Sequence, residues 1–183
     1  MNVTPNLGQQ IGYVLLWWLL LEGTGLLVLP LAFRLFRRLP DRGYALAKPL
    51  GLVAVNYVLW ISSTLGFLRN TWGNILLAAV GVGVFSWLFY RRRPDVQEGG
   101  QDAGLWAWLT EHWRTVLVSE LVFGLAFALW TLYKAYDPNI AITEKPMEFA
   151  FLNAIVRSSR FPPYDPWMSG YSISYYYFGY VMM

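Results

Sequence analysis

Two glutamates and two arginines lie in one polar segment of this sequence, residues 134–174. Glu144 and Glu148 are four positions apart, so they would share one face of a helix. A carboxylate there could take a proton from a bound hydroxyl as a general base. Arg157 and Arg160 follow in the same segment and could neutralise a phosphate. These residue types would support acid–base chemistry beside a phosphate, provided that a water-exposed, lipid-accessible groove holds them together.

The residues from Thr143 to Ser159 are expected to form one short helix at the outer membrane surface. Thr143 is an acceptable N-cap, and Pro146 falls in the first turn, where its missing N–H costs nothing. At about 100° per residue, the arginines and Asn153 lie on roughly the opposite face from the glutamates. The helix dipole also favours acids in the first turn and arginines in the last, so a purely structural role stays open.

Prolines restrict the chain directly after this expected helix. Three of them fall within Phe161–Trp167 and fix the backbone of a turn. Such a rigid turn either links two elements or presents Asp165 and Trp167 at a site.

A run of aromatic residues, Tyr175–Gly179, lies in the last apolar stretch. An aromatic belt at the membrane interface is one interpretation of it. Consecutive residues point in different directions around a helix, so at least one tyrosine is expected to face the protein. Its hydroxyl could then bind sugar or phosphate. The three tyrosines are Tyr175, Tyr176 and Tyr177.

The composition indicates a membrane protein. Of 183 residues, 56% are hydrophobic and only 14% are charged, whereas soluble domains are roughly 45–50% apolar and about 25% charged. An ordinary soluble domain, a disordered chain and a nucleic-acid-binding domain are therefore excluded. Cysteine is absent and His112 is the single histidine, which excludes disulfides, thiolate chemistry and a histidine-rich metal site. The sequence predicts no metal site, and a cofactor such as a divalent metal stays open.

Four apolar blocks are long enough to cross a bilayer as helices, which takes about 20 residues. They are Ile11–Phe36, Ala47–Leu68, Trp72–Tyr90 and Thr115–Tyr133. A fifth stretch runs from Tyr171 to Met183, which is too short to span, and no helix stop follows it. The expected fold is all-α and multi-pass, with an external amphipathic helix and a Pro-rich turn between the fourth and fifth spans. The chain is expected to be the N-terminal piece of a longer protein.

Basic residues set the expected topology. They are concentrated in the loops after the first and third blocks, which places those loops in the cytoplasm. The N-terminus and the loop 134–174 would then lie outside the cell membrane. Three regions are expected along the chain. They are a three-span membrane region (1–93), a cytoplasmic linker with an interfacial helix that carries Trp106, Trp108 and Trp113 (94–113), and the start of a membrane core (114–183).

Two acids fall inside apolar blocks. Glu22 lies midway through the first block beside Gly23 and Gly25, where an unpaired carboxylate is costly. Glu22 could have a function, as a site for a lipid headgroup or a proton. Alternatively, it is a protonated side chain that forms a hydrogen bond with a neighbouring helix, and the glycines allow that helix to approach closely. Glu120, in the first third of the fourth block, is near enough to the cytoplasmic face to reach headgroups. A structural role is favoured for both.

Three segments resemble the Chlor_Arch_YYY family of large, very hydrophobic membrane proteins, which is named for a YYY-x-G motif. They are Glu144–Glu148, Phe161–Trp167 and Tyr175–Gly179, and the last matches the naming motif in full. The resemblance runs from about Leu117 to Gly179. Glu148 stands where the family usually has Asp, so a carboxylate is kept.

The resemblance implies a reaction, because the family is grouped by distant similarity with GT-C glycosyltransferases. Those enzymes transfer a sugar, usually from a polyprenyl-phosphate carrier, at the outer face of the membrane. Residues 114–183 would then begin a GT-C-like core, with Glu148 as the acceptor base and Glu144 and Asp165 as alternatives. The remaining implied site residues hold the donor phosphate (Lys145, Arg157, Arg160) or stack on sugar and line the lipid path (Trp167, Tyr175, Tyr176, Tyr177).

Two other functions fit the same residues. The chain could be a non-catalytic structural subunit of a larger membrane complex, with the external helix as a docking surface. A transporter fits less well, because transporter sites lie near the midplane between repeats and only Glu22 with its glycines is there. The expected partners are membrane lipid, a polyprenyl-phosphate sugar donor and further membrane subunits, and no nucleic acid.

Overall fold

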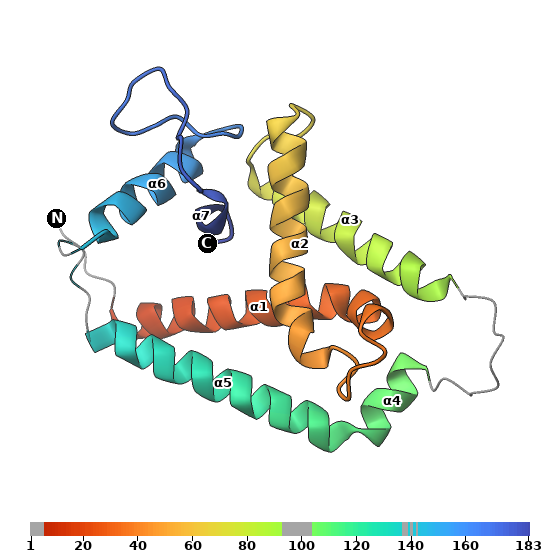
Figure 1. Cartoon of the computed structure of the whole chain (residues 1–183). Helices are drawn as coiled ribbons and strands as arrows, with labels where there is room; N and C mark the ends of the chain where they lie inside the picture. The colour runs from red at the N-terminus through yellow and green to blue at the C-terminus, as the bar shows by residue number, and fades with distance from the viewer. Residues whose placement is uncertain (1–5, 93–103, 137–138, 140, 142) are drawn as a thin grey trace. The chain divides into compact units, whose positions relative to one another are not determined.

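The computed structural model describes residues 6–92, 104–136, 139, 141 and 143–183. It is 72% helical, and the described residues form no strand, only an isolated bridge between Tyr164 and Ser172. The helices are α1 (Leu7–Leu35), α2 (Tyr44–Thr64), α3 (Trp72–Arg91), α4 (Leu105–Glu111), α5 (Trp113–Tyr136), α6 (Lys145–Arg157) and α7 (Phe178–Val181) (Figure 1). The predicted all-α class is confirmed.

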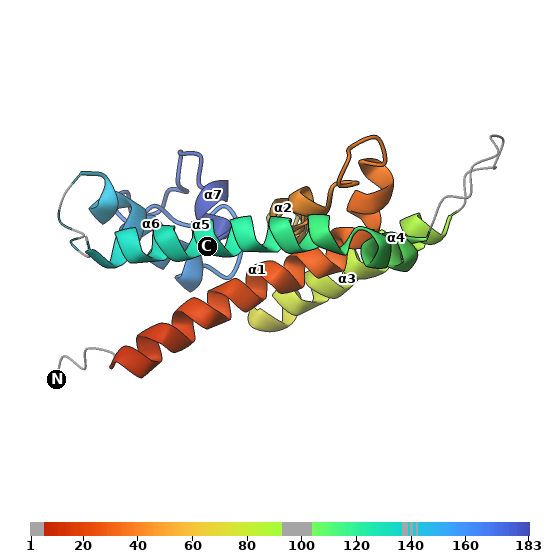
Figure 2. The same ribbon diagram turned by 90° about the horizontal axis from the view of Figure 1, so that it is seen from below.

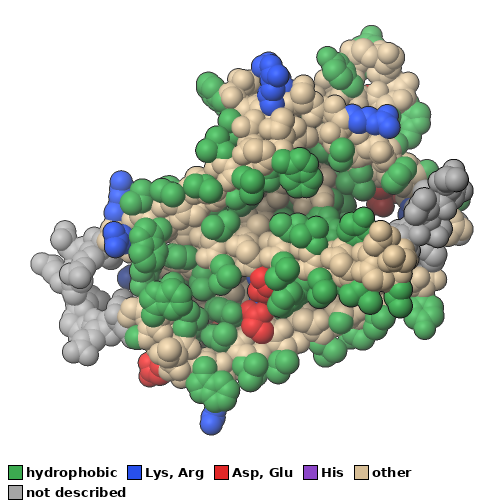
Figure 3. All heavy atoms as spheres, turned by 180° about the vertical axis from the view of Figure 1, so that it is seen from behind, with side chains coloured by type: hydrophobic (Ala, Val, Ile, Leu, Met, Phe, Trp, Pro, Cys, Tyr) green, Lys and Arg blue, Asp and Glu red, His purple; other side chains and the backbone are tan. Residues whose placement is uncertain are grey.

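Within this described part of the chain, four helices are long and apolar enough to cross a membrane, namely α1, α2, α3 and α5. Each coincides with a predicted apolar block to within a few residues, because a long apolar stretch in lipid must satisfy its backbone internally as a helix. Large hydrophobic side chains remain exposed along them, and hydrophobic side chains cover much of the face in Figure 3. The multi-pass membrane class is therefore confirmed, and the outside location of the N-terminus stays a prediction.

Contacts divide the chain into two compact units. The first comprises the described residues of Met1–Gly51 and Phe85–Asp137, and the second those of Leu52–Val84 and Pro138–Met183. Each unit thus combines segments that are distant in sequence, whereas the predicted regions follow the order of the chain.

In the first unit, α4 packs on the end of α1 through aromatic rings. The Phe33 ring meets Trp108 with 5.6 Å between centroids and Tyr90 with 6.3 Å. The Tyr90 hydroxyl accepts a 2.8 Å hydrogen bond from the Leu105 N–H at the start of α4. Trp106 is exposed, whereas Trp108 is buried against α1. Both ribbon views show α4 bending directly into α5 (Figures 1 and 2).

In the second unit, α6 and α7 pack around Phe151. Its ring lies 5.6 Å from Trp167, 5.6 Å from Tyr175 and 5.8 Å from Tyr180, measured between centroids. A second apolar cluster joins α2, α3 and α6 to the chain that follows α6. It consists of Leu59, Ala78, Ile155 and Phe161. The last apolar stretch contains only the short α7, in agreement with its predicted inability to span.

Helix α6 matches the predicted external helix to within two residues at each end. Pro146 stands in its first turn, as predicted. The predicted N-cap is wrong, because Thr143 has a φ of 63° and Glu144 occupies the cap position without a side-chain hydrogen bond to the helix. The left-handed backbone at Thr143 differs from the extended conformation that is typical of an N-cap residue.

Candidate functional site

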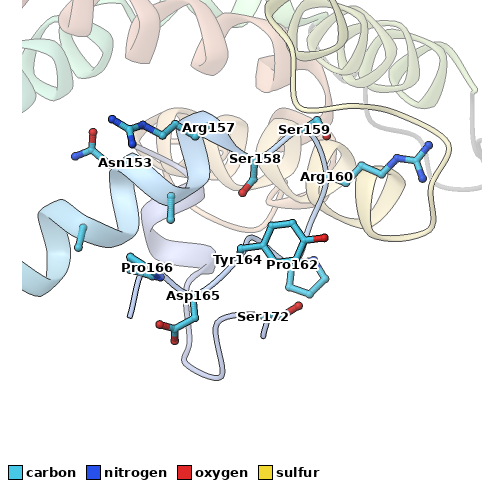
Figure 4. A pocket seen from close by; sticks show the side chains of 12 residues that line it. Asn153, Arg157, Ser158, Ser159, Arg160, Pro162, Tyr164, Asp165, Pro166 and Ser172 are labelled. Atoms are coloured by element: carbon cyan, nitrogen blue, oxygen red, sulfur yellow. The ribbon is translucent and has the colours of Figure 1, made fainter. Parts of the chain in front are cut away.

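A groove of about 660 Å³ lies between the C-terminal half of α6 and the Pro-rich loop that follows it (Figure 4). Arginine, serine, tyrosine and aspartate side chains contribute to its walls. Among them are Arg157, Ser158, Ser159, Arg160, Tyr164 and Asp165. The groove therefore gathers polar groups from two segments of the second unit.

One wall is a loop that closes on itself. The carbonyl of buried Pro163 accepts a 3.0 Å hydrogen bond from the Ile173 N–H, and the Asp165 N–H donates to the Tyr171 carbonyl at 2.9 Å. Gly170, with a φ of 86°, lies in the turn that the contact between Asp165 and Tyr171 closes. Glycine adopts this left-handed conformation without a steric cost. The loop is thus held by its own backbone, as the prolines indicated.

The other wall is anchored by a residue from the loop between α2 and α3. The Asn70 amide donates to the carbonyls of Ile155 at 2.8 Å and Ser158 at 3.1 Å. Its backbone N–H donates to the Ser159 carbonyl at 2.8 Å. Carbonyls at a helix C-terminus lack partners within the helix. Asn70 therefore fixes the place where α6 ends.

The two arginines lie at opposite ends of the groove. Figure 4 shows Ser158 and Ser159 between them and the two guanidinium groups pointing in opposite directions. Both arginine side chains are exposed. Arg157 and Arg160 therefore present their charges at the rim of the groove.

Asp165 has a structural contact as well as a place in the groove. Its Oδ1 accepts hydrogen bonds from the Trp167 N–H at 2.8 Å and the Met168 N–H at 3.0 Å. A carboxylate that accepts backbone N–H groups in this way stabilises a turn. The sequence predicted a rigid turn that presents Asp165 at a site, and Asp165 itself stabilises this turn.

The glutamates predicted as catalytic residues lie near tyrosines of the C-terminal segment. Glu144 and Glu148 are exposed at the start of α6 and within electrostatic range of Tyr180. The Tyr175 hydroxyl donates a 2.8 Å hydrogen bond to the Tyr176 hydroxyl, and their rings stack with centroids 4.0 Å apart. This hydrogen bond favours the neutral phenol and raises the pKa of Tyr175 to about 12. These five residues form what we term the acid–tyrosine patch.

The structure thus divides the predicted site residues into two groups. Glu148 and Arg157 both belong to α6, and their nine-residue separation puts them about 14 Å apart along the axis and on opposite faces. Asp165 shares the groove with the arginines, whereas Glu144 and Glu148 do not line it.

The remaining predicted residues have structural contacts. Lys145 Nζ donates to the Asn139 carbonyl at 2.9 Å. Trp167 packs against Phe151. Tyr177 faces the protein, as expected of one tyrosine, and its hydroxyl accepts a 3.0 Å hydrogen bond from Trp60 Nε1.

The sequence interpretation missed a cluster of charges inside the spans of the first unit. Lys48 Nζ lies 3.2 Å from Glu22 Oε2 and 2.6 Å from Glu120 Oε1. The Tyr44 hydroxyl donates to the same Glu120 oxygen at 2.7 Å. We call Glu22, Lys48 and Glu120 the ion triad. Glu22 therefore has a cationic partner, and Glu120 contacts protein rather than headgroups alone.

A signal for this triad was present in the sequence. A cation is one way to stabilise two carboxylates inside apolar blocks, and Lys48 is the lysine that falls at the start of the second block. The predicted close approach holds at Gly25, where an added Cβ would lie 2.8 Å from Lys48 Cγ. It does not hold at Gly23, where a Cβ would meet open space.

The groove has the chemistry of an anion site. Guanidinium groups donate paired hydrogen bonds to phosphate, and serine hydroxyls add further donors. No group of three or more His, Cys, Asp or Glu side chains that could hold a metal ion occurs in the described ranges. The arrangement can hold a phosphate with the Asp165 carboxylate in the same groove.

Comparison with known proteins places most of this chain in one family. Residues 54–183 match the family model of an uncharacterized membrane protein, DUF2298. The match begins within α2 and includes α3, whereas the motif resemblance begins near Leu117. Neither the curated proteins nor the solved structures contain a match to the chain. The matched region spans well over half of the sequence, and the chain therefore belongs to the DUF2298 family of uncharacterized membrane proteins.

Proposed function

We propose that this protein is a glycosyltransferase-like membrane protein that binds a polyprenyl-phosphate sugar donor at the outer membrane face. The observation that carries the proposal is the groove beside α6, with two arginines and an aspartate, in a chain with four candidate spans. The resemblance to the YYY-x-G family supplies the reaction class, which is sugar transfer from a lipid phosphate.

The groove suits a phosphate joined to a sugar. Its volume of about 660 Å³ falls within the range of roughly 300–1,000 Å³ that small-molecule sites occupy. Arg157 and Arg160 are exposed at its two ends, so a phosphate at either end would meet one guanidinium group. The hydroxyls of Ser158 and Ser159 lie between the arginines and could bond to phosphate or sugar oxygens.

The acid that acts on the acceptor is better sought in the groove than outside it. Asp165 lines the groove, whereas Glu148 is about 14 Å along α6 from Arg157 and on the other face. A general base must be within hydrogen-bond reach of the proton that it takes. We therefore assign the acceptor contact to Asp165 and keep Glu148, which the resemblance favours, as the residue to test against it.

Sugar transfer by membranes that contain the full protein separates these two acids. Labelled sugar would be followed from a polyprenyl-phosphate donor into an extractable acceptor. We expect Asp165→Asn to lower the transfer rate about 100-fold or more and Glu148→Gln to retain most of it. Asparagine keeps an oxygen for the turn hydrogen bonds, so folding is preserved.

If Glu148→Gln lowers the transfer rate and Asp165→Asn does not, the general base is Glu148 and not Asp165. Unchanged transfer in both variants, at equal protein levels in the membrane, would contradict the assignment of either acid. A failure of wild-type membranes to transfer sugar from any polyprenyl-phosphate donor would contradict the proposed function itself.

A structural subunit is the second candidate, and one observation favours it. Helix α5 is a candidate span in which no described residue is buried. Its surface is therefore available to lipid or to further helices. Glu144 and Glu148, exposed away from the groove, would then dock a partner chain. Replacing both with glutamine should release other subunits in mild detergent, while Arg157→Gln should not.

A further inference from the structure

Three helices of the first unit bring charged side chains together. Glu22 comes from α1, Lys48 from α2 and Glu120 from α5. Lys48 lies about one turn into α2 and Glu120 about two turns into α5. A lysine near the end of a membrane helix normally extends to the interface. Lys48 is instead only 8% exposed, and its ammonium contacts both carboxylates.

The charges of this cluster do not balance. Two carboxylates face one ammonium, and the other described residues that line their cavity carry no charge. Tyr44 on α2 contributes a hydroxyl, and Phe123 on α5 contributes a ring 4.4 Å from Lys48 Nζ. With both glutamates ionised, the triad holds one excess negative charge. An uncompensated charge inside a membrane is costly, and one bound proton removes it.

The contacts distinguish the two glutamates. Glu120 Oε1 accepts hydrogen bonds from both Lys48 and Tyr44, at 2.6 Å and 2.7 Å, as suits an ionised carboxylate. Glu22 contacts Lys48 through Oε2 at the longer distance of 3.2 Å. Its Oε1 is buried and has no hydrogen-bond partner within the part of the chain that the structure describes. Glu22 is therefore the carboxyl group with an oxygen suited to carry a proton.

The space around the triad limits the ligand. The cavity that Glu22, Lys48 and Glu120 line has a volume of about 10 Å³, close to what one water molecule needs. A hydrated ion or a sugar requires much more room, and a proton requires none. Close packing accounts for this small volume, because an added Cβ on Gly25 would lie 2.8 Å from Lys48 Cγ.

We propose that the ion triad is a proton-binding site, in which one proton on Glu22 neutralises the contact of α1 with α2 and α5. The charged and titratable groups that face Glu22 are Lys48 and Tyr44 from α2 and Glu120 from α5. Loss of the proton leaves an uncompensated carboxylate at this helix contact. The contact therefore weakens as pH rises past the point at which the proton leaves. The inference is independent of the groove and of sugar transfer.

Infrared spectra of the purified full chain in lipid nanodiscs test the proposal directly. A protonated carboxyl group absorbs separately from a carboxylate. At pH 7 we expect a buried protonated-carboxyl band that disappears in Glu22→Gln. The control Glu111→Gln, at an exposed glutamate of α4, is expected to retain the band. Absence of the band in the wild type, or its persistence in Glu22→Gln, overturns the proposal.

Thermal unfolding gives a second and independent test. Glutamine resembles a protonated glutamic acid, so Glu22→Gln should unfold at the wild-type temperature, while Glu120→Gln should unfold at a lower one. Equal losses of unfolding temperature in the two variants overturn the proposal.

The infrared spectra are also recorded with sodium replaced by a bulky organic cation. A carboxyl band that appears only without sodium identifies a cation site and likewise overturns it.

Discussion

At the scale of single residues, backbone donors and acceptors shape the groove, and the charged side chains project from that frame. Asn70 caps the end of α6, and Asp165 accepts two N–H groups of the turn that follows it. Arg157 and Arg160 are exposed on the resulting walls. The positions of the arginines therefore depend on the neutral Asn70 and on the Asp165 carboxylate.

Removal of the Asn70 side chain is expected to destabilise the second unit. Asn70→Ala removes the 2.8 Å hydrogen bond to the Ile155 carbonyl, which keeps the Ser158 N–H as a donor, and the 3.1 Å hydrogen bond to the Ser158 carbonyl. This loss should lower the free energy of unfolding by about 1–3 kcal/mol. The control is Asn74→Ala, which removes one hydrogen bond of 2.9 Å to the Arg69 carbonyl. Unfolding in detergent compares the two variants, and equal effects would contradict the capping role of Asn70.

The acid–tyrosine patch has a pH dependence of its own. The hydrogen bond to Tyr176 raises the pKa of Tyr175 from 10.0 to about 12. The stabilisation from this raised pKa is fully present below about pH 10, the ordinary pKa of tyrosine. It is lost as the pH rises through the pKa that Tyr175 has in the folded protein. Ultraviolet titration, taken as the difference between wild type and Tyr175→Phe, measures that value. Tyr176→Phe should return it toward the ordinary pKa, and an unchanged titration would contradict the contact.

At the scale of elements, helices α1 and α2 approach each other at a glycine. A Cβ added to Gly51 would lie 2.1 Å from the Thr24 carbonyl oxygen. Two helix backbones can come this close only where a residue lacks a side chain. The same approach brings Lys48 to Glu22.

Substitution of Gly51 tests this approach. Gly51→Ala should force α1 and α2 apart and lower the free energy of unfolding by about 1–3 kcal/mol, as overpacking does. Gly81→Ala in α3 is the matched control, because a Cβ there meets nothing within 4 Å. That variant should be neutral or slightly more stable, since alanine favours helix. Thermal unfolding measures the stability of both variants. Equal stability of Gly51→Ala and Gly81→Ala would contradict the close packing of α1 and α2.

Composition was sufficient to predict the spans, and spacing was sufficient to predict α6, because both depend on local sequence. The Thr143 cap was predicted wrongly, because the residue type alone does not reveal the left-handed backbone there. Lys48 and Asn70 were missed as partners because their contacts, to Glu120 and to Ile155, join distant segments. The separation of Glu148 from Arg157 was visible in their spacing alone.

At the scale of the whole molecule, the described chain carries two separate sets of chemistry. The groove and the acid–tyrosine patch belong to the second unit, and the ion triad belongs to the first. Sugar transfer at the outer face requires the second unit's loop to lie outside. The positive-inside pattern of the sequence predicts this orientation.

None of these 183 residues is cysteine, so a single cysteine introduced among them can report on the topology. Ser169→Cys, in the exposed loop beside the groove, should react with a membrane-impermeant maleimide in intact cells. Arg38→Cys, in the exposed loop after α1, should react only after permeabilisation. The reverse labelling pattern would contradict the orientation, and with it the outer-face location of the groove.

Native mass spectrometry of the full protein, released gently from its own membranes, tests the central claim most directly. We predict that the wild type retains a polyprenyl phosphate or its sugar adduct, as does the control Arg114→Gln. Arg157→Gln combined with Arg160→Gln should lower retention at least about tenfold, since charge-assisted hydrogen bonds contribute about 1.5–3 kcal/mol each. A wild-type protein without such a lipid, or equal retention in the double variant, would contradict the account.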